Sequence, residues 1–374
     1  MRDIADRLAA WNDAGTRYAV ATVVAVRGSA PRPPGAALAV SADGEAAGSV
    51  SGGCVETAVY DLCREALATG RVLRETFGYS DDDAFAVGLT CGGTIEVWVR
   101  PGPVPGPALA PDGHAAVVWL LDGSIVVVRS DGHTGTTGRA DVDRAVVAEA
   151  RAMLGLGRTG QASVHCRDGV RTDAAETDTA ETDAVEMFVH SHAPPPRLLV
   201  YGAIDHAAAL ARQGALLGYR VTVCDARPVF ATRARFPDAD EVIVDWPHRH
   251  LAAEAERGAL DGRTVVCVLT HDPKFDVPLL RAALRLPVAY VGALGSRRTH
   301  RDRLARLRDA GLADRDLARL RAPIGLDLGA RTPQETAVAI AAEFTAARHG
   351  GTALPLGQIN GPIHHDRPAP AGAA

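Results

Sequence analysis

The sequence has few aromatic residues, few cysteines and no excess of basic charge, and each shortage excludes a class of protein. Phe, Trp and Tyr make up 5% of the 374 residues, so the core has to be built mainly from Ala, Val and Leu. The six cysteines include no CxxC pair and do not form the disulfide framework of a small secreted protein. The formal net charge is -5, so no basic excess exists to displace counterions from a nucleic acid.

Long apolar runs are missing as well. No stretch approaches the roughly 20 residues of a membrane span. The opening residues, Met-Arg-Asp-Ile-Ala-Asp-Arg, lack the apolar segment of a signal peptide. We therefore expect a cytoplasmic protein without a membrane partner. Hydrophobic residues amount to 47% and charged residues to 23%, the balance of a globular protein, in a chain long enough for two domains.

The first hundred residues mix strand-like and helix-like segments. Apolar, β-branched composition predicts strands at residues 18–26, 37–41, 72–77 and 94–100. Helical periodicity predicts helices at residues 2–14 and 55–68. Residues 1–100 are therefore predicted to form an α+β domain. The Pro- and Gly-rich residues 101–113 indicate a linker or a long turn.

Residues 101–193 are expected to complete or link this domain. Two strand-like segments at residues 115–121 and 124–128, joined by Asp-Gly, predict a hairpin, and a helix is predicted over residues 142–153. Between about 167 and 186 the sequence repeats Ala-Glu-Thr-Asp. Such an acidic segment of small residues cannot bury enough apolar area to order itself, so we expect a mobile loop there.

After residue 194 short apolar runs alternate regularly with helical stretches. The runs lie at residues 198–201, 220–224, 242–244, 264–268 and 289–291. This alternation predicts a parallel sheet covered on both faces, hence a Rossmann-like, doubly wound α/β domain over residues 194–360. A capping box and a proline at the first helical position predict that the last helix starts at Thr332. Residues 361–374 are interpreted as a disordered tail.

The loop after the first of these strands is an incomplete dinucleotide fingerprint. Gly202 matches the first glycine of G-x-G-x-x-G/A, but Ile204 stands where the second glycine lets the backbone approach a pyrophosphate. Asp205 adds negative charge at a helix N-terminus that would otherwise favour phosphate. Asp225 follows the second strand, at the position that binds a ribose hydroxyl. Gly202 and Asp225 are thus candidate nucleotide contacts, but an altered pocket is preferred over ordinary NAD(P) binding.

A better anion site follows the last of the five runs. Gly295 permits close approach of a ligand, Ser296 can cap the next helix, and Arg297 adds a cation beside exposed backbone amides. The alternative is a simple helix start with surface arginines. His271 and Asp272 follow the fourth run, at the carboxyl edge of the sheet where ligands of such folds bind. Asp272 could equally be a helix cap.

Two cysteines stand beside paired glycines, in the segments Gly-Gly-Cys54 and Cys91-Gly-Gly. Cys54 directly precedes a predicted helix, whose N-terminal dipoles favour a thiolate. Glycine pairs allow unusual φ angles and leave the sulfur accessible to a bulky ligand. The alternative, a small buried apolar residue, suits Cys63, Cys224 and Cys267 better. The candidate residues of these two segments are Gly52, Gly53, Cys54, Cys91, Gly92 and Gly93.

Six separated motifs resemble those of the XdhC/CoxI family. Three lie in the N-terminal part, APR at residues 30–32, GSVSGGCVE at 48–56 and LTCGG at 89–93. Three lie in the C-terminal part, LTHD at 269–272, YVGALGS at 290–296 and PIGLDLGA at 323–330. Their number and order make the resemblance far more specific than any single glycine pattern. The family's usual Gly-Ala-Gly-His is replaced here by Gly-Ala-Ile-Asp at residues 202–205.

The resemblance implies an accessory protein that binds molybdenum cofactor, supports its sulfuration with a cysteine desulfurase and delivers it to the apoenzyme of a molybdenum hydroxylase. By that analogy Cys54 and Cys91 contact the cofactor or its terminal sulfur. An anionic, sulfur-bearing cofactor also needs phosphate-binding backbone and cations. Arg32, the backbone of the Gly52-Gly53 turn and the loop of Gly295, Ser296 and Arg297 supply such groups if the two domains face one another across a cleft. Glu56, which lies in a resembling motif, completes the candidate set.

Two other functions remain open at this point. An NAD(P)-dependent oxidoreductase would use the Rossmann-like half, and a docking scaffold would bind partner proteins without a cofactor site. We rank the cofactor carrier first, and therefore a maturation chaperone before an enzyme. No catalytic residue and no metal ligand is assigned. A homodimer is expected because it is the commonest oligomeric state.

Overall fold

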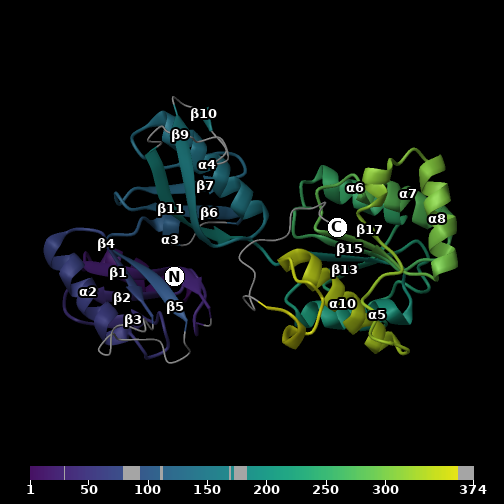
Figure 1. The fold of residues 1–374 in the computed structure, drawn as a ribbon, viewed down its shortest axis with the longest axis horizontal. Coiled ribbons are helices and arrows are strands. Elements are labelled where there is room, and N and C mark those ends of the chain that lie inside the picture. The colour runs from purple at the N-terminus through teal and green to yellow at the C-terminus, as the bar shows by residue number, and fades with distance from the viewer. Residues whose placement is uncertain (29, 79–92, 110–112, 168–169, 172–182, 361–374) are drawn as a thin grey trace. The chain divides into compact units, whose positions relative to one another are not determined.

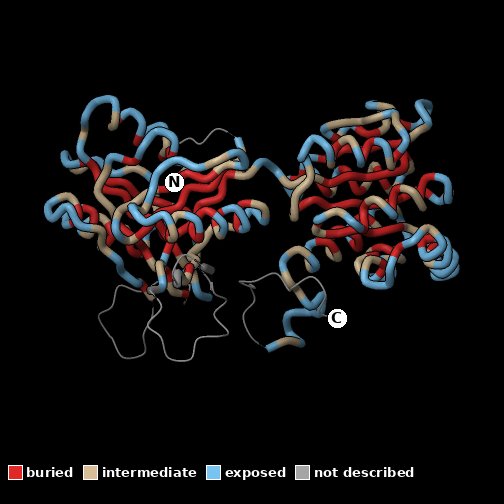
Figure 2. The backbone as a smooth tube through the Cα atoms, turned by 90° about the horizontal axis from the view of Figure 1, so that it is seen from above, coloured by how far each residue is buried: buried red, intermediate tan, exposed pale blue. Residues whose placement is uncertain are grey.

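The computed structural model describes the chain except for residues 29, 79–92, 110–112, 168–169, 172–182 and 361–374 (Figure 1). The chain divides into two compact units, Met1–Pro194 and Pro195–Ala374, each with its own hydrophobic cores. Figure 2 shows that the strands of each unit are among its most buried segments. None of the helices in the described part of the chain has the length and hydropathy of a membrane span. Most of the expected acidic loop and the expected tail lie outside the described residues.

The first unit begins with a five-stranded antiparallel sheet in the order β3-β2-β1-β5-β4. Its strands are β1 (Tyr18–Arg27), β2 (Ala37–Ser41), β3 (Ala46–Gly48), β4 (Leu73–Phe77) and β5 (Thr94–Pro101). The 14-residue helix α2 (Glu56–Thr69) packs on one face through Val59, Cys63 and Ala66. A 3₁₀ turn (Arg2–Ile4) and helix α1 (Ala5–Asp13) precede the sheet. The predicted strands and helices of this region are therefore observed, with β3 added.

A second sheet of six strands follows in the order β10-β9-β11-β6-β7-β8. Its strands are β6 (Ala115–Leu120), β7 (Ile125–Arg129), β8 (His133–Thr134), β9 (Gly160–Arg167), β10 (Val170–Arg171) and β11 (Asp183–His192). Helix α4 (Ala140–Gly155) covers one face. The short helix α3 (Gly106–Leu109) lies within the expected linker.

The expectation of a loop over about 167–186 is wrong at both of its ends. β10 lies inside this range, and β11 begins at Asp183. β11 pairs with β9 on one side and with β6 on the other, so distant segments supply its backbone hydrogen bonds. Local composition cannot show such non-local pairing, so the prediction extended the loop too far at both ends. The acidic repeat itself lies almost entirely outside the described residues.

The two sheets of this unit share one hydrophobic core. Val20 and Trp98 of the first sheet belong to the same buried cluster as Val117, Trp119 and Phe188 of the second. Because side chains alternate between the faces of a strand, each sheet places one set of residues in this shared core and the other under its own helix. The result is a packed pair of sheets with α2 and α4 on separate outer faces.

The second unit is a parallel sheet of six strands in the order β14-β13-β12-β15-β16-β17. Its strands are β12 (Arg197–Tyr201), β13 (Arg220–Asp225), β14 (Glu241–Val244), β15 (Val265–Val268), β16 (Tyr290–Ala293) and β17 (Leu320–Arg321). Helices α5 (Asp205–Leu216) and α10 (Pro333–His349) cover one face, and α6 (Pro247–Glu256), α7 (Pro273–Ala283) and α8 (Arg297–Asp309) cover the other, with α9 (Asp314–Leu317) beside them. This confirms the predicted Rossmann-like, doubly wound domain.

The strand order places a topological switch between β12 and β15. The chain runs from β12 outward through β13 to β14 and then returns to the other side of β12. Loops that leave neighbouring strands in opposite directions open a crevice at the carboxyl edge of such a sheet. Helix α10 starts as predicted, because Thr332 accepts from the Glu335 amide (3.2 Å) and Glu335 accepts from the Thr332 amide (2.9 Å).

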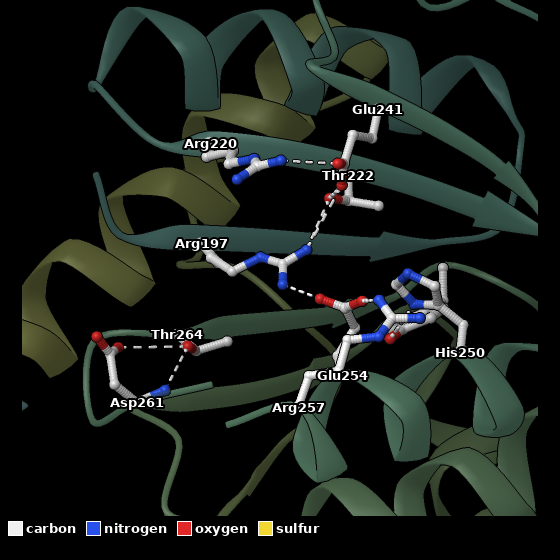
Figure 3. A network of polar contacts seen from close by, with 10 residues as sticks. Arg197, Arg220, Thr222, Glu241, His250, Glu254, Arg257, Asp261 and Thr264 are labelled. Carbon is white, nitrogen blue, oxygen red and sulfur yellow. Dashed lines mark hydrogen bonds and ion pairs between the residues drawn. The ribbon is translucent and has the colours of Figure 1, made fainter. Parts of the chain in front are cut away.

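A buried polar network lies at the opposite, amino edge of this sheet (Figure 3). Arg197 at the start of β12 pairs with Glu254 of α6, and their side chains are only 12% and 7% exposed. Arg197 Nη2 also donates to Thr222 Oγ1 (3.3 Å), which donates to Glu241 Oε2 (3.1 Å). Arg197 and Glu241 begin β12 and β14, and Thr222 lies near the start of β13 between them. We therefore interpret the network as the polar contacts that cover the amino edge of the sheet.

Candidate functional site

The glycine pair before Cys54 forms a turn with left-handed backbone. Gly52 has φ 79° and Gly53 has φ 125°, values that residues with a side chain rarely adopt. A Cβ atom added to either glycine would meet no other atom within 4 Å, so the space above the turn is open. Both glycines are thus required by conformation, and their exposed faces leave room for a ligand.

The Glu56 carboxylate lies inside this turn and accepts most of its donors. Oε1 accepts from Ser49 Oγ (2.6 Å) and from the amides of Ser51 and Gly52 (2.9 Å each). Oε2 accepts from the Gly53 amide (2.7 Å) and from Ser51 Oγ. Burial alone would raise the pKa of Glu56, but the hydrogen bonds from the two serines and from Gly53 lower it to about 2. The protein's own carboxylate therefore occupies the amide cradle that the sequence suggested for a ligand anion.

Cys54 is half-buried at the end of this turn, two residues before α2 begins at Glu56. Cys63 on the same helix is fully buried, and burial raises the pKa of its thiol to about 12. Cys54 is thus partly exposed although it also packs against the core beneath the sheet, whereas Cys63 is fully enclosed. Cys91 and Gly92 lie outside the described residues, and Gly93 is buried just before β5.

Arg32 lies in the proline-rich loop between β1 and β2. Its Nη1 is 3.7 Å from Asp3 Oδ2, and its side chain is 41% exposed. The same loop continues to Gly35, whose carbonyl accepts from the buried N-terminal amine of Met1. The loop is therefore tied to the N-terminal turn, and the Arg32 guanidinium remains accessible to solvent.

In the second unit the loops after β12 and β15 touch at the switch point. Gly202 has φ 117°, and a Cβ atom there would be 3.0 Å from the backbone of Leu269 and Thr270. Only glycine allows this approach. Ile204 packs its side chain against the core below, which explains how the missing second glycine is accommodated.

Asp225 is engaged within the protein. Only 2% exposed, it accepts from the Ala203 amide (2.7 Å) and from Arg227 Nη2 (2.8 Å) through Oδ2, and from the amide and Nε of Arg227 (2.9 Å each) through Oδ1. Burial would raise the pKa of Asp225, but the hydrogen bonds from Arg227 and Ala203 lower it overall. The carboxylate expected to bind a ribose hydroxyl therefore fixes two loops to each other. Sequence reasoning missed Arg227, for which the spacing of two residues from Asp225 was a faint signal.

Asp272 is the N-cap of α7. It accepts from the Lys274 amide (3.1 Å), and its Oδ2 is 3.0 Å from Lys274 Nζ. The hydrogen bonds from Lys274 lower the pKa of Asp272, and the charge of Arg227 adds to the effect. His271 beside it is exposed. Asp272 is therefore a helix cap, which was the alternative interpretation of the sequence. Its carboxylate, in the loop after β15, also lies close enough to Arg227, in the loop after β13, to be affected by that charge.

The loop after β16 has the form that the sequence predicted. Ser296 caps α8 by accepting from the Thr299 amide (3.1 Å), and Arg297 is exposed in the first turn. Gly295 has φ 149°, and its Cβ would lie 3.2 Å from Thr299. A helix N-terminus with adjacent arginines is favourable for an anion.

A buried ion pair supports this loop from below. Arg303 of α8 is 3% exposed, and its Nη2 donates to Asp276 of α7 and to the Leu294 carbonyl (2.9 Å each). Asp276 also accepts from Thr270, which follows β15. Burial raises the pKa of Asp276 more than these partners lower it. One pair thus connects the β15 loop, α7 and α8. Nothing in the sequence distinguishes Arg303 from the other arginines of that helix.

The structure brings the second-unit candidates together at one sheet edge. Gly202, His271, Asp272 and Gly295 all follow carboxyl ends of neighbouring parallel strands. Arg32, the Gly52 turn and Cys54 belong to the first unit. A groove of about 420 Å³ on α4 and β8 is lined by residues such as His133, Asp143 and Arg151, and by none of the predicted site residues.

Two family models match the chain. The XdhC and CoxI family matches residues 11–78, and the XdhC Rossmann domain matches residues 198–344. Together they span more than half of the chain and fall in different units.

Three curated proteins are similar. An Escherichia coli protein named uncharacterized protein YqeB is 31% identical over 64% of this chain, which spans only 42% of that relative. A Bacillus subtilis protein, named as a probable subunit of xanthine dehydrogenase, is 28% identical over 88% of this chain and 92% of its own length. The Escherichia coli molybdenum cofactor insertion chaperone PaoD is 28% identical over 89% of this chain and 84% of its own length.

A crystal structure described as a xanthine dehydrogenase from Bacillus halodurans has the same fold. It aligns with 92% of this chain and 95% of its own at a TM-score of 0.54 and 23% identity. The motif resemblance is thus confirmed by the two domain matches, by the relatives and, for the fold, by this structure. The chain belongs to the XdhC/CoxI family.

Proposed function

We propose that this protein binds molybdenum cofactor, supports its sulfuration and delivers it to a molybdenum hydroxylase of the xanthine or carbon monoxide dehydrogenase type. The observation that carries the proposal is the similarity to the molybdenum cofactor insertion chaperone PaoD, which extends over 89% of this chain. The similarity to a probable subunit of xanthine dehydrogenase supports a molybdoenzyme as the partner.

The turn at Cys54 is suited to a sulfur- or metal-containing group. Glu56 receives hydrogen bonds from the backbone of the turn, so the loop is already ordered before a ligand arrives. A preorganised site loses less conformational entropy on binding. The half-buried thiol and the open faces of Gly52 and Gly53 provide a soft donor and room beside it.

The carboxyl edge of the second unit is suited to a phosphate group. The N-terminus of α8, with Ser296 as cap and Arg297 exposed beside it, offers backbone amides and a cation. Arg303 and Asp276 hold this loop against α7. The cofactor's phosphate is the group that this arrangement would bind.

The engagement of Asp225 disfavours an NAD(P)-dependent oxidoreductase. Both of its oxygens accept hydrogen bonds from within the protein, and Ile204 replaces the glycine next to the pyrophosphate position. Calorimetric titration with NAD(H) and NADP(H) is therefore expected to give no saturable binding. Micromolar affinity would reinstate the oxidoreductase.

The decisive experiment is anaerobic purification followed by molybdenum and pterin analysis. The wild-type protein, produced in cells that make the cofactor, is expected to contain both. Cys54→Ala should retain several-fold less pterin, and a combined Cys54→Ala and Cys91→Ala variant less still. Cys63→Ala is the matched control, because this thiol is enclosed on α2, the helix that follows the turn, and its loss should not affect retention of the pterin. Wild-type protein without pterin or molybdenum, and unable to activate an apo-hydroxylase, would refute the proposal.

A further inference from the structure

A small cavity lies between the two facing sheets of the first unit. Its volume is about 20 Å³, which is enough for one water molecule or one small ion. Apolar side chains form much of its wall, and the polar side chains Thr22 and Arg100 and the indole of Trp119 complete it. The apolar side chains are those of Val24, Val72, Trp98, Leu120 and Phe188. The polar groups that line it are therefore surrounded by apolar side chains.

Arg100 of β5 is half-buried and lines this cavity. Its Nη2 donates to the Gly123 carbonyl (3.2 Å). Its Nε and Nη1 are buried and have no hydrogen-bond partner among the described residues. Burial lowers the pKa of Arg100, but only to about 10, so the side chain stays charged at neutral pH. Asp122 acts on this charge from a distance without forming an ion pair with it.

Trp119 of β6 adds a further donor from the opposite sheet. Its side chain is 5% exposed, and its indole Nε1 also has no hydrogen-bond partner within the described part of the chain. The Arg100 guanidinium lies over its ring, with Cζ 4.7 Å from the ring centroid. Trp98 differs, because its Nε1 donates to Glu96 (2.9 Å). The unsatisfied indole is therefore a local feature of the cavity and not a general property of the tryptophans here.

The groups without partners are all donors, and two of them, Nε and Nη1 of Arg100, are buried atoms of a positively charged guanidinium. Buried donors and charges are costly unless a complementary group satisfies them. A water molecule would accept at most two of these bonds, and among the lining side chains only the Thr22 hydroxyl is a good acceptor for its own hydrogens. An anion accepts from every direction and also neutralises the guanidinium.

We propose that this cavity binds a small monovalent anion of the halide class, held by Nε and Nη1 of Arg100 and by Nε1 of Trp119. The anion joins donors from two sheets, so it acts as an internal counter-ion that stabilises the packing of the first unit. Chloride is the halide available to the protein in ordinary buffers. The proposal is independent of the cofactor function, because it concerns the core between the sheets.

Bromide is the direct probe of this site. Crystals of the full chain soaked in sodium bromide should show an anomalous peak within hydrogen-bond distance of Arg100 and Trp119. The peak should be absent from crystals of Arg100→Met, in which an apolar side chain of similar length replaces the charge. Density without anomalous signal at this position would identify a water, and bromide found only on the surface would be adventitious. Either result would overturn the proposal.

A solution measurement separates loss of the anion from loss of folding. The unfolding temperature of the wild-type protein should rise as chloride replaces gluconate at constant ionic strength, because an anion bound only in the folded state stabilises it. Trp119→Phe and Arg100→Met should lose most of this dependence. Trp98→Phe is the matched control, because it borders the same cavity but its indole N–H is already bonded to Glu96, and it should keep the dependence. A wild-type unfolding temperature that does not depend on chloride would contradict the proposal even if a variant fails to fold.

Discussion

Replacing Glu56 by glutamine tests whether the turn at Cys54 is held by an internal anion. The carboxylate accepts from Ser49, Ser51 and the amides of Gly52 and Gly53. Glutamine has nearly the same shape but offers one acceptor oxygen and places an NH₂ group against donors. We therefore expect the turn and the start of α2 to loosen while the fold of the sheet is kept.

The pKa shift sets the size of this effect. The pKa of Glu56 falls from its ordinary value of 4.5 to about 2, and each unit corresponds to about 1.4 kcal/mol of unfolding free energy. Because the side chain is partly exposed, solvent screening reduces the expected contribution to about 1–2 kcal/mol. A folded-state pKa below the unfolded value stabilises the protein above pH 4.5, and the stabilisation is lost as the pH falls toward 2. The difference between wild type and Glu56→Gln should accordingly shrink by roughly half at about pH 3.

Urea unfolding followed by tryptophan fluorescence measures this difference. Three of the four tryptophans lie in the first unit, so a Trp246→Phe background restricts the signal to that unit. Glu65→Gln is the matched control, because it removes the same charge from an exposed position of the same helix. The reasoning fails if Glu56→Gln and Glu65→Gln are equally stable, or if the loss for Glu56→Gln is the same at pH 7 and pH 3.

Three further predictions concern single contacts. Gly53→Ala should cost about 1–2 kcal/mol in the same urea assay, because alanine is strained at φ 125° although no atom lies within 4 Å of its Cβ. Glu254→Gln should destabilise the second unit by about 2 kcal/mol, since it removes the nearer of the two carboxylates that pair with the buried Arg197 and leaves only Glu241, at 3.6 Å. Replacing both Arg197 and Glu254 by Met should recover part of this loss. Asp225→Asn should destabilise the second unit by about 2 kcal/mol at pH 7 and by less below pH 4, because the pKa of Asp225 is lowered in the folded state. Trp246 lies in the second unit, so its fluorescence measures the stability loss of both the Glu254 and the Asp225 variants. A loss for Asp225→Asn that is equal at pH 3 and pH 7 would refute the prediction for Asp225.

Local signals in the sequence were enough to predict much of the fold. The parallel strands were visible as short apolar runs, and α10 began where the capping box placed it, because each of these patterns is contained within a few neighbouring residues. The strands β9 and β11 were missed. β9 is rich in polar residues, and β11 pairs on one side with β6, which lies far away in the chain, so neither strand gave a clear local signal. β17 has two residues and carries too little pattern to be recognised.

The candidate site also has features that the sequence predicted and features that it could not predict. The positive φ of Gly52 and Gly53 and the cap at Ser296 follow from residue type and neighbourhood, and both were predicted. The partners of Glu56 and Asp225 were not, because a carboxylate looks the same in sequence whether it awaits a ligand or binds its own backbone. Only the observed hydrogen bonds distinguish the two cases.

The two candidate turns also differ in charge, and this difference predicts which group each would bind. At Cys54 the backbone donors already face a carboxylate, so a phosphate would meet occupied amides and a negative charge. At α8 the cap is a neutral serine and the neighbouring Arg297 is positive, so a phosphate is favoured there. Inorganic phosphate should therefore leave the rate of Cys54 alkylation by iodoacetamide unchanged, as measured by mass spectrometry of the peptide. It should protect Arg297 from phenylglyoxal, and an Arg212→Lys variant, which changes an exposed arginine of α5, should show the same protection. Protection of Cys54 by phosphate would show that the anion enters the turn despite Glu56, and the assignment of groups to the two turns would have to be reversed.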